Sequence, residues 1–182
     1  MKTPLSALAL VCLASCRPAP SASLATPPGV VARRIAVTSR SFSANGPIPV
    51  DYTCDGADRS PNLTLSALPP GTRSLAVIAD DPDAPGGDIV HWVAYNLPAD
   101  TMSLAEGKDV TELGGITGIN GFGRPGYSGP CPPKFEEHSY MFHVYALDVT
   151  LPPRANATSD DLQAAMNGHL LGEGALMGTF SH

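Results

Sequence analysis

The chain has 182 residues, of which 17 are acidic and 11 are Lys or Arg, giving a formal net charge of −6. It has no basic stripe and no aromatic residues interleaved with Arg or Lys, so the sequence argues against nucleic acid as a partner. An acidic body also gains nothing from an anionic lipid surface. Attachment to a membrane would therefore have to come from acyl chains.

The first sixteen residues predict a cleaved secretory signal that ends at a lipidation site. Lys2 gives a positive start, and the apolar run from Leu5 to Ala14 is much shorter than the ~20 residues of a membrane-spanning helix. The tetrapeptide Leu13-Ala14-Ser15-Cys16 resembles the lipobox of bacterial lipoproteins, whose cysteine is acylated. We therefore expect residues 1–15 to be the signal peptide and Cys16 the lipidated N-terminus of an envelope protein. An ordinary secretory signal cut nearby is the alternative.

The residues after the predicted lipidation site suggest a location and a linker. Arg17 stands where Asp would be the usual inner-membrane retention signal, which favours the periplasmic face of the outer membrane. The segment that follows is rich in Pro, Ala and Ser, a composition that buries too little apolar surface to order itself. Residues 16–33 are thus predicted to be a tether, and residues 34–182 a single domain with one core.

Two cysteines fall inside the predicted domain, Cys54 and Cys131. An oxidising compartment permits a disulfide between them, which would close a long loop and stabilise the fold by roughly 4 kcal/mol in the chain-entropy model. Two free buried thiols are the alternative, because the sequence gives no Cα separation. The pair lacks the spacing of a zinc site, and we expect neither a metal nor a cofactor.

Dense Pro and Gly punctuation separates short apolar segments of period two, which predicts a mainly β domain. Leu75–Ala79 is expected to be a buried central strand. Val90–Leu97 should be the next strand, with alternate residues on opposite faces. That alternation places His91 on the same face as Val93 and Tyr95.

A third strand and one helix complete the predicted elements. Ser139–Val149 is largely apolar on both faces and should be covered on both sides. Ser159–Leu171 is the only persuasive helix, capped by Thr158 or Ser159 and ended by Gly172.

Polar side chains gather where these strands begin and end. Two carboxylates and a proline follow the first strand in a rigid turn, an imidazole opens the second strand, and an imidazole and a phenol open the third. The predicted ligand-binding residues are Asp81, Asp83, Pro85, His91, Gly129, His138 and Tyr140. A few convergent polar groups in an apolar sheet are typical of a small binding site. A solvated acidic turn with structural histidines is the alternative interpretation.

The chemistry of these groups favours an anion with a neighbouring amine. Imidazole and phenol groups donate hydrogen bonds, and the loop around Gly129 should leave backbone N–H groups open to a ligand. The carboxylates favour an amine or a protonated oxygen. We therefore predict a small anion or a phospholipid head group of the phosphoethanolamine kind as the ligand.

Six short motifs share one order and spacing with a known family. They are Tyr52-Thr53-Cys54-Asp55-Gly56, Ser60-Pro61, Asp81-Pro82-Asp83-Ala84-Pro85, His91-Trp92-Val93, Tyr127-Ser128-Gly129-Pro130-Cys131-Pro132-Pro133 and His138-x-Tyr140. Together they resemble the phosphatidylethanolamine-binding, or Raf kinase inhibitor-like, family, and the first two point to its bacterial branch. The resemblance implies a large central antiparallel sheet with a smaller flanking sheet and one or two helices, and a pocket at one sheet end.

The resemblance also implies a function. Family members are binding modules, described as kinase or protease inhibitors and signalling modulators, so we expect no enzymatic activity. In one respect the chain departs from the family, which usually has Arg between the His and the Tyr of the last motif, where this chain has Ser139. A fork of cationic donors is lost there.

Two other classes of function are open to the sequence. A hydrolase could use His91 or His138 as general base with Asp83 orienting it, but Ser128 is the only nucleophile near and no Gly-x-Ser-x-Gly elbow is present. A purely structural envelope lipoprotein would leave the polar groups at the strand ends unexplained.

Overall fold

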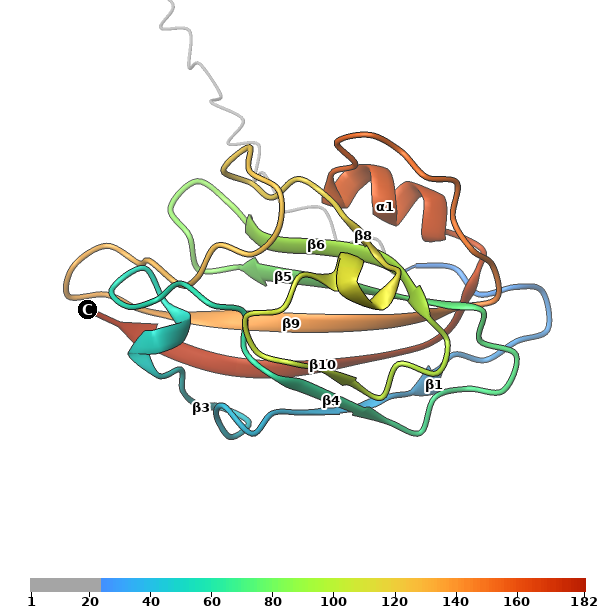
Figure 1. Ribbon diagram of the computed structural model, residues 1–182, viewed down its shortest axis with the longest axis horizontal. Helices are drawn as coiled ribbons and strands as arrows, with labels where there is room; N and C mark the ends of the chain where they lie inside the picture. The colour runs from blue at the N-terminus through green and yellow to red at the C-terminus, as the bar shows by residue number, and fades with distance from the viewer. Residues whose placement is uncertain (1–23) are drawn as a thin grey trace, which may run out of the picture.

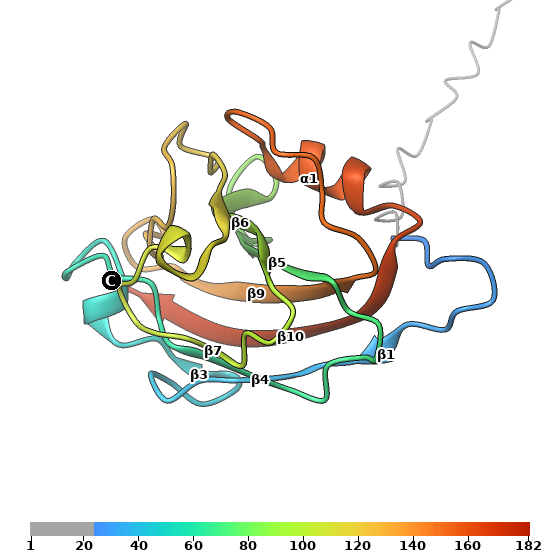
Figure 2. The same cartoon turned by 45° about the vertical axis from the view of Figure 1, so that its right-hand side comes forward.

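The computed structural model describes residues 24–182 and arranges them in three layers (Figure 1). A seven-stranded sheet forms the middle layer, with a three-stranded sheet on one face and the helix α1 on the other. The view in Figure 2, turned by 45°, shows the same layers. The predicted signal peptide and Cys16 lie outside the described residues.

The large sheet has the strand order β1-β10-β9-β5-β6-β8, and β3 also pairs with β10. Its strands are β1 (Arg33–Arg34), β3 (Gly46–Pro47), β5 (Ser74–Asp81), β6 (Ile89–Pro98), β8 (Ile116–Thr117), β9 (Glu137–Leu147) and β10 (Leu170–Ser181). The small sheet, in the order β2-β4-β7, consists of β2 (Ala36–Thr38), β4 (Leu63–Ser66) and β7 (Ser103–Leu104). The helices are the 3-10 turns η1 (Val50–Tyr52) and η2 (Val110–Leu113) and the α-helix α1 (Ser159–Met166).

The predicted fold class is confirmed, with a large sheet, a smaller sheet and, within residues 24–182, one α-helix. The central strands from β10 through β9, β5 and β6 to β8 are antiparallel, as expected. The two short strands β1 and β3 run parallel to β10, so the sheet as a whole is mixed. Both belong to the N-terminal segment, which follows the free edge of β10 and crosses to the small sheet between them.

Two apolar cores lie on opposite faces of the large sheet. Val77 and Val144 point into the core between the two sheets, whereas Ile78 and Val93 point into the core under α1. Fully burying side chains of this kind stabilises the fold by roughly 1.5–3 kcal/mol each. Because both faces of β5 are covered, this strand is buried along almost its whole length, as predicted for Leu75–Ala79.

The α-helix begins where predicted and ends earlier. The Thr158 side chain accepts a hydrogen bond from Asp161 N, and the Asp161 side chain accepts one from Thr158 N, which forms a capping box. At Asn167 the backbone is already extended, with φ −61° and ψ 125°. The predicted end at Leu171 is therefore wrong, since Leu170 opens β10.

The long strand β10 was not predicted, because three glycines interrupt its apolar pattern. Their role is close packing, which Gly174 illustrates. A Cβ atom at Gly174 would lie 2.1 Å from the carbonyl oxygen of Ile35. The missing side chain thus lets the N-terminal segment lie directly against the strand.

The last part of the predicted tether lies against the domain. Leu24 packs against the core under α1. Ala25 N donates to Asn167 Oδ1 at 3.0 Å, and Gly168 N donates to the carbonyl oxygen of Ala25 at 2.9 Å. In the described part of the chain, no helix has the length and apolar character needed to cross a membrane.

Candidate ligand-binding site

Four of the predicted ligand-binding residues come together at one end of the large sheet. Asp81 ends β5, His91 lies near the start of β6, and His138 and Tyr140 lie near the start of β9. All four are buried, with exposed fractions of 2–4 %. We call Asp81, His91, His138 and Tyr140 the strand-end cluster. The loops that surround this end of the sheet lie on the left in Figure 1.

Asp81 and His138 form a buried pair. The His138 Nδ1 atom lies 2.8 Å from Asp81 Oδ2, and its Nε2 atom lies 3.4 Å from Glu136 Oε2. Burial lowers the pKa of His138, but hydrogen bonds to the Asp81 and Glu136 carboxylates outweigh it, and the net pKa is raised. The other Asp81 oxygen accepts Asp83 N at 2.9 Å, which fixes the carboxylate at the turn.

His91 does not lie where regular alternation places it. The pairing of β6 with β5 shifts register between Ala79 and Asp80, and His91 stands at this bulge. Its ring meets Tyr140 edge-on, with centroids 5.3 Å apart, while Val93 packs in the core on the opposite face. The prediction that His91 shares a face with Val93 and Tyr95 is therefore wrong, and the bulge is what turns the imidazole toward the strand-end cluster.

The hydrogen bonds of His91 define its free nitrogen. Nδ1 lies 2.6 Å from the carbonyl oxygen of Ser128, which can only accept, so Nδ1 carries the proton. Nε2 is then an acceptor as long as the ring is neutral. Burial lowers the pKa of His91 more than the Ser128 contact and the Asp81 charge raise it. The neutral ring is therefore favoured in the absence of a ligand.

Tyr140 occupies the centre of the strand-end cluster. Its ring is perpendicular to His91 and stacks on His138 with a centroid distance of 6.5 Å. The hydroxyl is buried and makes no hydrogen bond of normal geometry among residues 24–182, although the Asp81 carboxylate and the Cys131 backbone lie near it. Burial and the negative charge of Asp81 raise the pKa of Tyr140, so the group stays a hydrogen-bond donor at any physiological pH. A buried hydroxyl of this kind normally has a partner.

Asp83 and Pro85 lie in the exposed turn after β5. The Asp83 carboxylate is held, because its Oδ2 accepts Ser139 N at 2.8 Å. This hydrogen bond is the main reason why the pKa of Asp83 is lowered. The backbone of Ser139 thus contributes a donor at the position of the family's Arg.

The N–H of Gly129 is used within the protein and is not open to a ligand. Its amide donates to Asp58 Oδ1, and a Cβ atom at this position would lie 2.4 Å from the carbonyl oxygen of Tyr52. The expectation of an open N–H at Gly129 is therefore wrong. The glycine is needed because the loop packs directly on the Tyr52–Thr53 backbone.

The predicted disulfide is present and closes the same contact. Cys54 and Cys131 are bonded with a Cα separation of 5.5 Å. Beside the bridge, Cys54 N donates to the Pro130 carbonyl oxygen at 3.1 Å, and the Tyr127 hydroxyl donates to the carbonyl oxygen of Tyr52 at 2.8 Å. The loop that supplies the Ser128 carbonyl is thus tied to the segment around η1.

The matching family model is that of phosphatidylethanolamine-binding proteins, and it covers residues 38–181. The chain belongs to the phosphatidylethanolamine-binding protein family. Two relatives named UPF0098 protein are similar: that of Aquifex aeolicus is 46 % identical over 150 residues, covering 79 % of this chain and 86 % of the relative. That of Chlamydia pneumoniae is 44 % identical over 147 residues, covering 78 % and 95 %.

Two solved structures of the family have the same fold. The phosphatidylethanolamine-binding protein homologue CT736 of Chlamydia trachomatis is 39 % identical with a TM-score of 0.77, covering 82 % of this chain and 98 % of its own. YbcL of Escherichia coli, described as a member of the mammalian family, is 31 % identical with a TM-score of 0.76, covering 82 % and 99 %.

Several residues that build the site in this family member were not predicted. Asp58 binds the Gly129 amide, and Asn120 is buried with Nδ2 donating to Ser128 Oγ at 3.0 Å. Phe122 packs edge-on against His91 with a centroid distance of 5.3 Å, and Glu136 faces His138. All four lie in loops among glycines and prolines, where no periodicity shows which side chain turns inward.

Proposed function

We propose that this phosphatidylethanolamine-binding protein family member binds a small oxyanion or a phosphorylated head group at the strand-end cluster. The observation that supports this most directly is the buried Tyr140 hydroxyl, which makes no hydrogen bond of normal geometry within residues 24–182. Leaving a buried donor unsatisfied costs about 1–3 kcal/mol, and an oxyanion beside the phenol would remove that penalty. His138 stacks on the same ring and has a raised pKa, so its positive charge would attract an anion, while its two ring nitrogens face Asp81 and Glu136.

His91 makes the proposed binding depend on protonation. Its neutral Nε2 is an acceptor, which fits a protonated ligand oxygen but repels a deprotonated one. A fully ionised phosphate would have to protonate His91 against the burial that lowers its pKa. The Asp81 carboxylate adds repulsion toward the anion and attraction toward an amine. We therefore expect phosphoethanolamine to bind better than inorganic phosphate, and both to bind better at lower pH.

Calorimetric titration tests this proposal. An isolated small site should bind phosphoethanolamine with micromolar to millimolar affinity, roughly −4 to −8 kcal/mol. His91→Ala should weaken binding by about 1–3 kcal/mol at pH 6. His169→Ala is the matched control, since His169 is partly exposed and contacts Asp148. Equal affinities in wild type and His91→Ala at pH 6 and pH 8 would reject the site.

We also propose that the protein is an envelope lipoprotein anchored through Cys16 at the periplasmic face of the outer membrane. The support is the lipobox-like Leu13–Cys16 and the Arg that follows it. Cys16→Ser should leave the domain folded but block lipidation and processing. If the variant still partitions with membranes and reaches the same mature mass, the anchor lies elsewhere.

Modulation of a kinase, protease or signalling partner is the further role that we propose at family level. Phe122 and Phe135 support a contact surface near the strand-end cluster, because they are 47 % and 95 % exposed. Replacing Phe135 with Ser should weaken capture of such a partner without weakening phosphoethanolamine binding, whereas Phe122 also packs against His91 and is left unchanged. Retained capture would place the partner surface elsewhere.

A hydrolase is the alternative, and the Asp81–His138 pair is the observation in its favour. A carboxylate 2.8 Å from a histidine is the arrangement of an oriented general base. Against this function, His138 Nε2 faces Glu136, and Ser128 Oγ already accepts a hydrogen bond from Asn120. Turnover of a nitrophenyl ester or phosphate that disappears in His138→Gln would support the enzyme over the binding module.

A further inference from the structure

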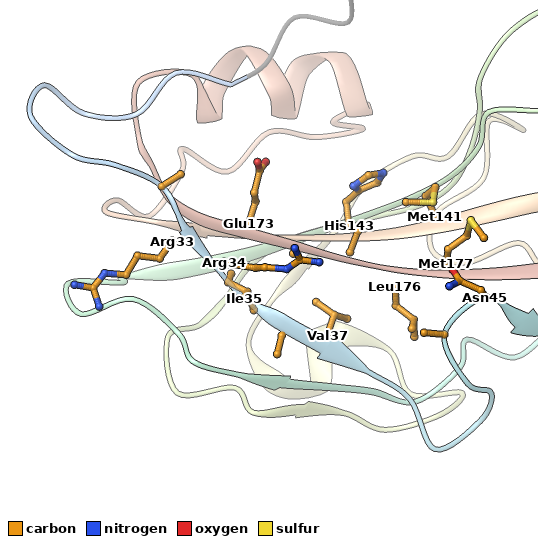
Figure 3. A pocket seen from close by; sticks show the side chains of 15 residues that line it. Arg33, Arg34, Ile35, Val37, Asn45, Met141, His143, Glu173, Leu176 and Met177 are labelled. Atoms are coloured by element: carbon orange, nitrogen blue, oxygen red, sulfur yellow. The ribbon is translucent and has the colours of Figure 1, made fainter.

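The face of the large sheet on the side of α1, called the outer face here, carries a groove (Figure 3). None of the residues of the strand-end cluster lines it. Its volume is about 890 Å³, and it lies where the N-terminal segment and β9 flank β10. Met141, His143 and Met177 are among the residues that line it. The prediction that β9 is covered on both sides is wrong here, since Met141 and His143 are only half-buried.

Strand register brings these three side chains together. Met141 on β9 pairs directly with Met177 on β10, and His143 lies two residues from Met141 on the same face. Directly opposed residues have Cβ atoms about 4.5–5.5 Å apart, and long side chains also reach the diagonal neighbour. Figure 3 shows the three side chains rising from the sheet on the same side.

Asp80 lies beside this group on the next strand. It pairs with Met141 from the β5 side, so one row across the sheet reads Asp80, Met141, Met177. Asp80 Oδ1 is 3.5 Å from His143 Nε2, which is within the distance of an ion pair, but this buried oxygen accepts no hydrogen bond within residues 24–182. We call Asp80, Met141, His143 and Met177 the outer-face cluster.

We propose that the outer-face cluster binds a soft monovalent cation, copper(I) or silver(I), through the two thioethers and the imidazole. Thioether sulfur is a soft ligand that selects copper(I), and imidazole is a common companion ligand. Asp80 is a positioning residue. With Nδ1 on the metal, Nε2–H would point toward Asp80 Oδ1, 3.5 Å away, which is the carboxylate–histidine arrangement common at metal sites. Tyr145 stacks on His143 at 6.2 Å and holds the ring from the other side.

The charges around the groove are compatible with a cation. Arg33, Arg34 and Glu173 also line the groove, but β1 pairs with β10 at Gly172 and Glu173, whereas Met141 pairs with β10 four residues further on, at Met177. Toward the loop, burial and the carboxylates of Asp80 and Asp81 raise the pKa of Asp88. The Asp80 carboxylate thus lies at the Met141–Met177 end of the groove, away from the end at which β1 pairs with β10.

Silver(I) is the probe of choice, because it needs no reductant and leaves the Cys54–Cys131 disulfide intact. The full chain is treated with N-ethylmaleimide to block free thiols and titrated with silver nitrate in chloride-free buffer. Methionine methyl NMR is the readout, since the chain has five methionines. We expect one silver ion per chain to shift the methyl signals of Met141 and Met177 and to leave the others in place. Zinc(II), a harder ion, should shift none.

Isosteric variants complete the test. Met141→Leu and Met177→Leu keep side-chain volume, and each should lower silver affinity by at least about tenfold, the loss that removal of an outer partner of a ligand already causes. Met102→Leu is the control, because Met102 is 49 % exposed and does not line the groove. Unchanged affinity in Met141→Leu and Met177→Leu, or an equal loss in Met102→Leu, would overturn the proposal, as would unchanged Met141 and Met177 signals in the wild type.

Discussion

The strand-end cluster and the outer-face cluster lie back to back on the same strands. Asp81 and Tyr140 face one side of the sheet, and their chain neighbours Asp80 and Met141 face the other. The first cluster is buried and built from nitrogen and oxygen groups, whereas the second is half-exposed and includes two thioethers. The period-two alternation of a strand thus divides adjacent residues between two clusters of different side-chain chemistry.

Of the two proposed binding sites, only the strand-end cluster should depend on the disulfide. The bridge closes a loop of 77 positions, for which the chain-entropy model gives about 4 kcal/mol of stability. Cys54→Ser combined with Cys131→Ser should lower the urea midpoint accordingly and weaken phosphoethanolamine binding, because the Ser128 carbonyl loses its support. Silver binding at 25 °C should stay unchanged. Equal weakening of both ligands would mean that the two clusters are not independent.

The two neighbouring aspartates should differ in their contribution to stability. Both Asp81 oxygens are hydrogen-bonded, so Asp81→Ala leaves His138 without its buried partner and should cost about 3 kcal/mol in the free energy of unfolding. Asp80→Ala removes an oxygen that has no partner in the described chain and should cost under about 1 kcal/mol. Urea denaturation of both variants measures the difference. Equal losses would contradict the contacts assigned to Asp81.

Tyr140→Phe should separate binding from stability. Removing a buried hydroxyl that lacks a partner within residues 24–182 should leave stability unchanged or raise it by up to about 1 kcal/mol. Phosphoethanolamine affinity should fall by about tenfold, the equivalent of one lost hydrogen bond. Thermal unfolding and calorimetry on the same preparation measure both. A clear loss of stability would mean that the hydroxyl has a partner in the free protein.

The free energy of unfolding of the wild type should change little with pH, because His138 and His91 contribute to its pH dependence with opposite signs. The raised pKa of His138 gives stability that is complete below its unfolded value of about 6.5 and lost as pH rises through the folded pKa. The lowered pKa of His91 gives the opposite, a loss as pH falls from about 6.5 through the folded pKa. His91→Gln should therefore unfold less easily at pH 6 than at pH 8, and His138→Gln more easily. Slopes of the same sign in both variants would contradict these assignments.

Much of the fold could be predicted because β5, β6 and β9 have regular apolar patterns. The strand β10 could not be predicted, since Gly172, Gly174 and Gly178 allow close backbone contact and interrupt its apolar alternation. The residues of the strand-end cluster could be named from their motifs, but the geometry could not. The bulge at His91 reverses its face, and the Gly129 amide is taken by Asp58. Neither effect shows in the local sequence pattern, because the bulge arises in the pairing of β6 with β5 and Asp58 lies 71 residues from Gly129.

The outer-face cluster could not be predicted from the sequence either. Only Met141 and His143 were assigned to a strand from the sequence. No motif marks Met141 and Met177 as neighbours, because Met177 lies on β10, which was not predicted. Register between strands distant in sequence is set by the whole sheet. Only the assembled sheet therefore places the two sulfurs beside His143.

The central claim is that the strand-end cluster is the anion site, and imidazole NMR tests it most directly. The chain has five histidines, which act as internal reporters. Adding phosphoethanolamine at pH 6 to protein labelled with ¹⁵N at histidine should move the ring signals of His91 and His138. The signals of His143, His169 and His182 should stay in place. Saturable shifts of the His143, His169 or His182 signals, with the His91 and His138 signals unchanged, would contradict the account.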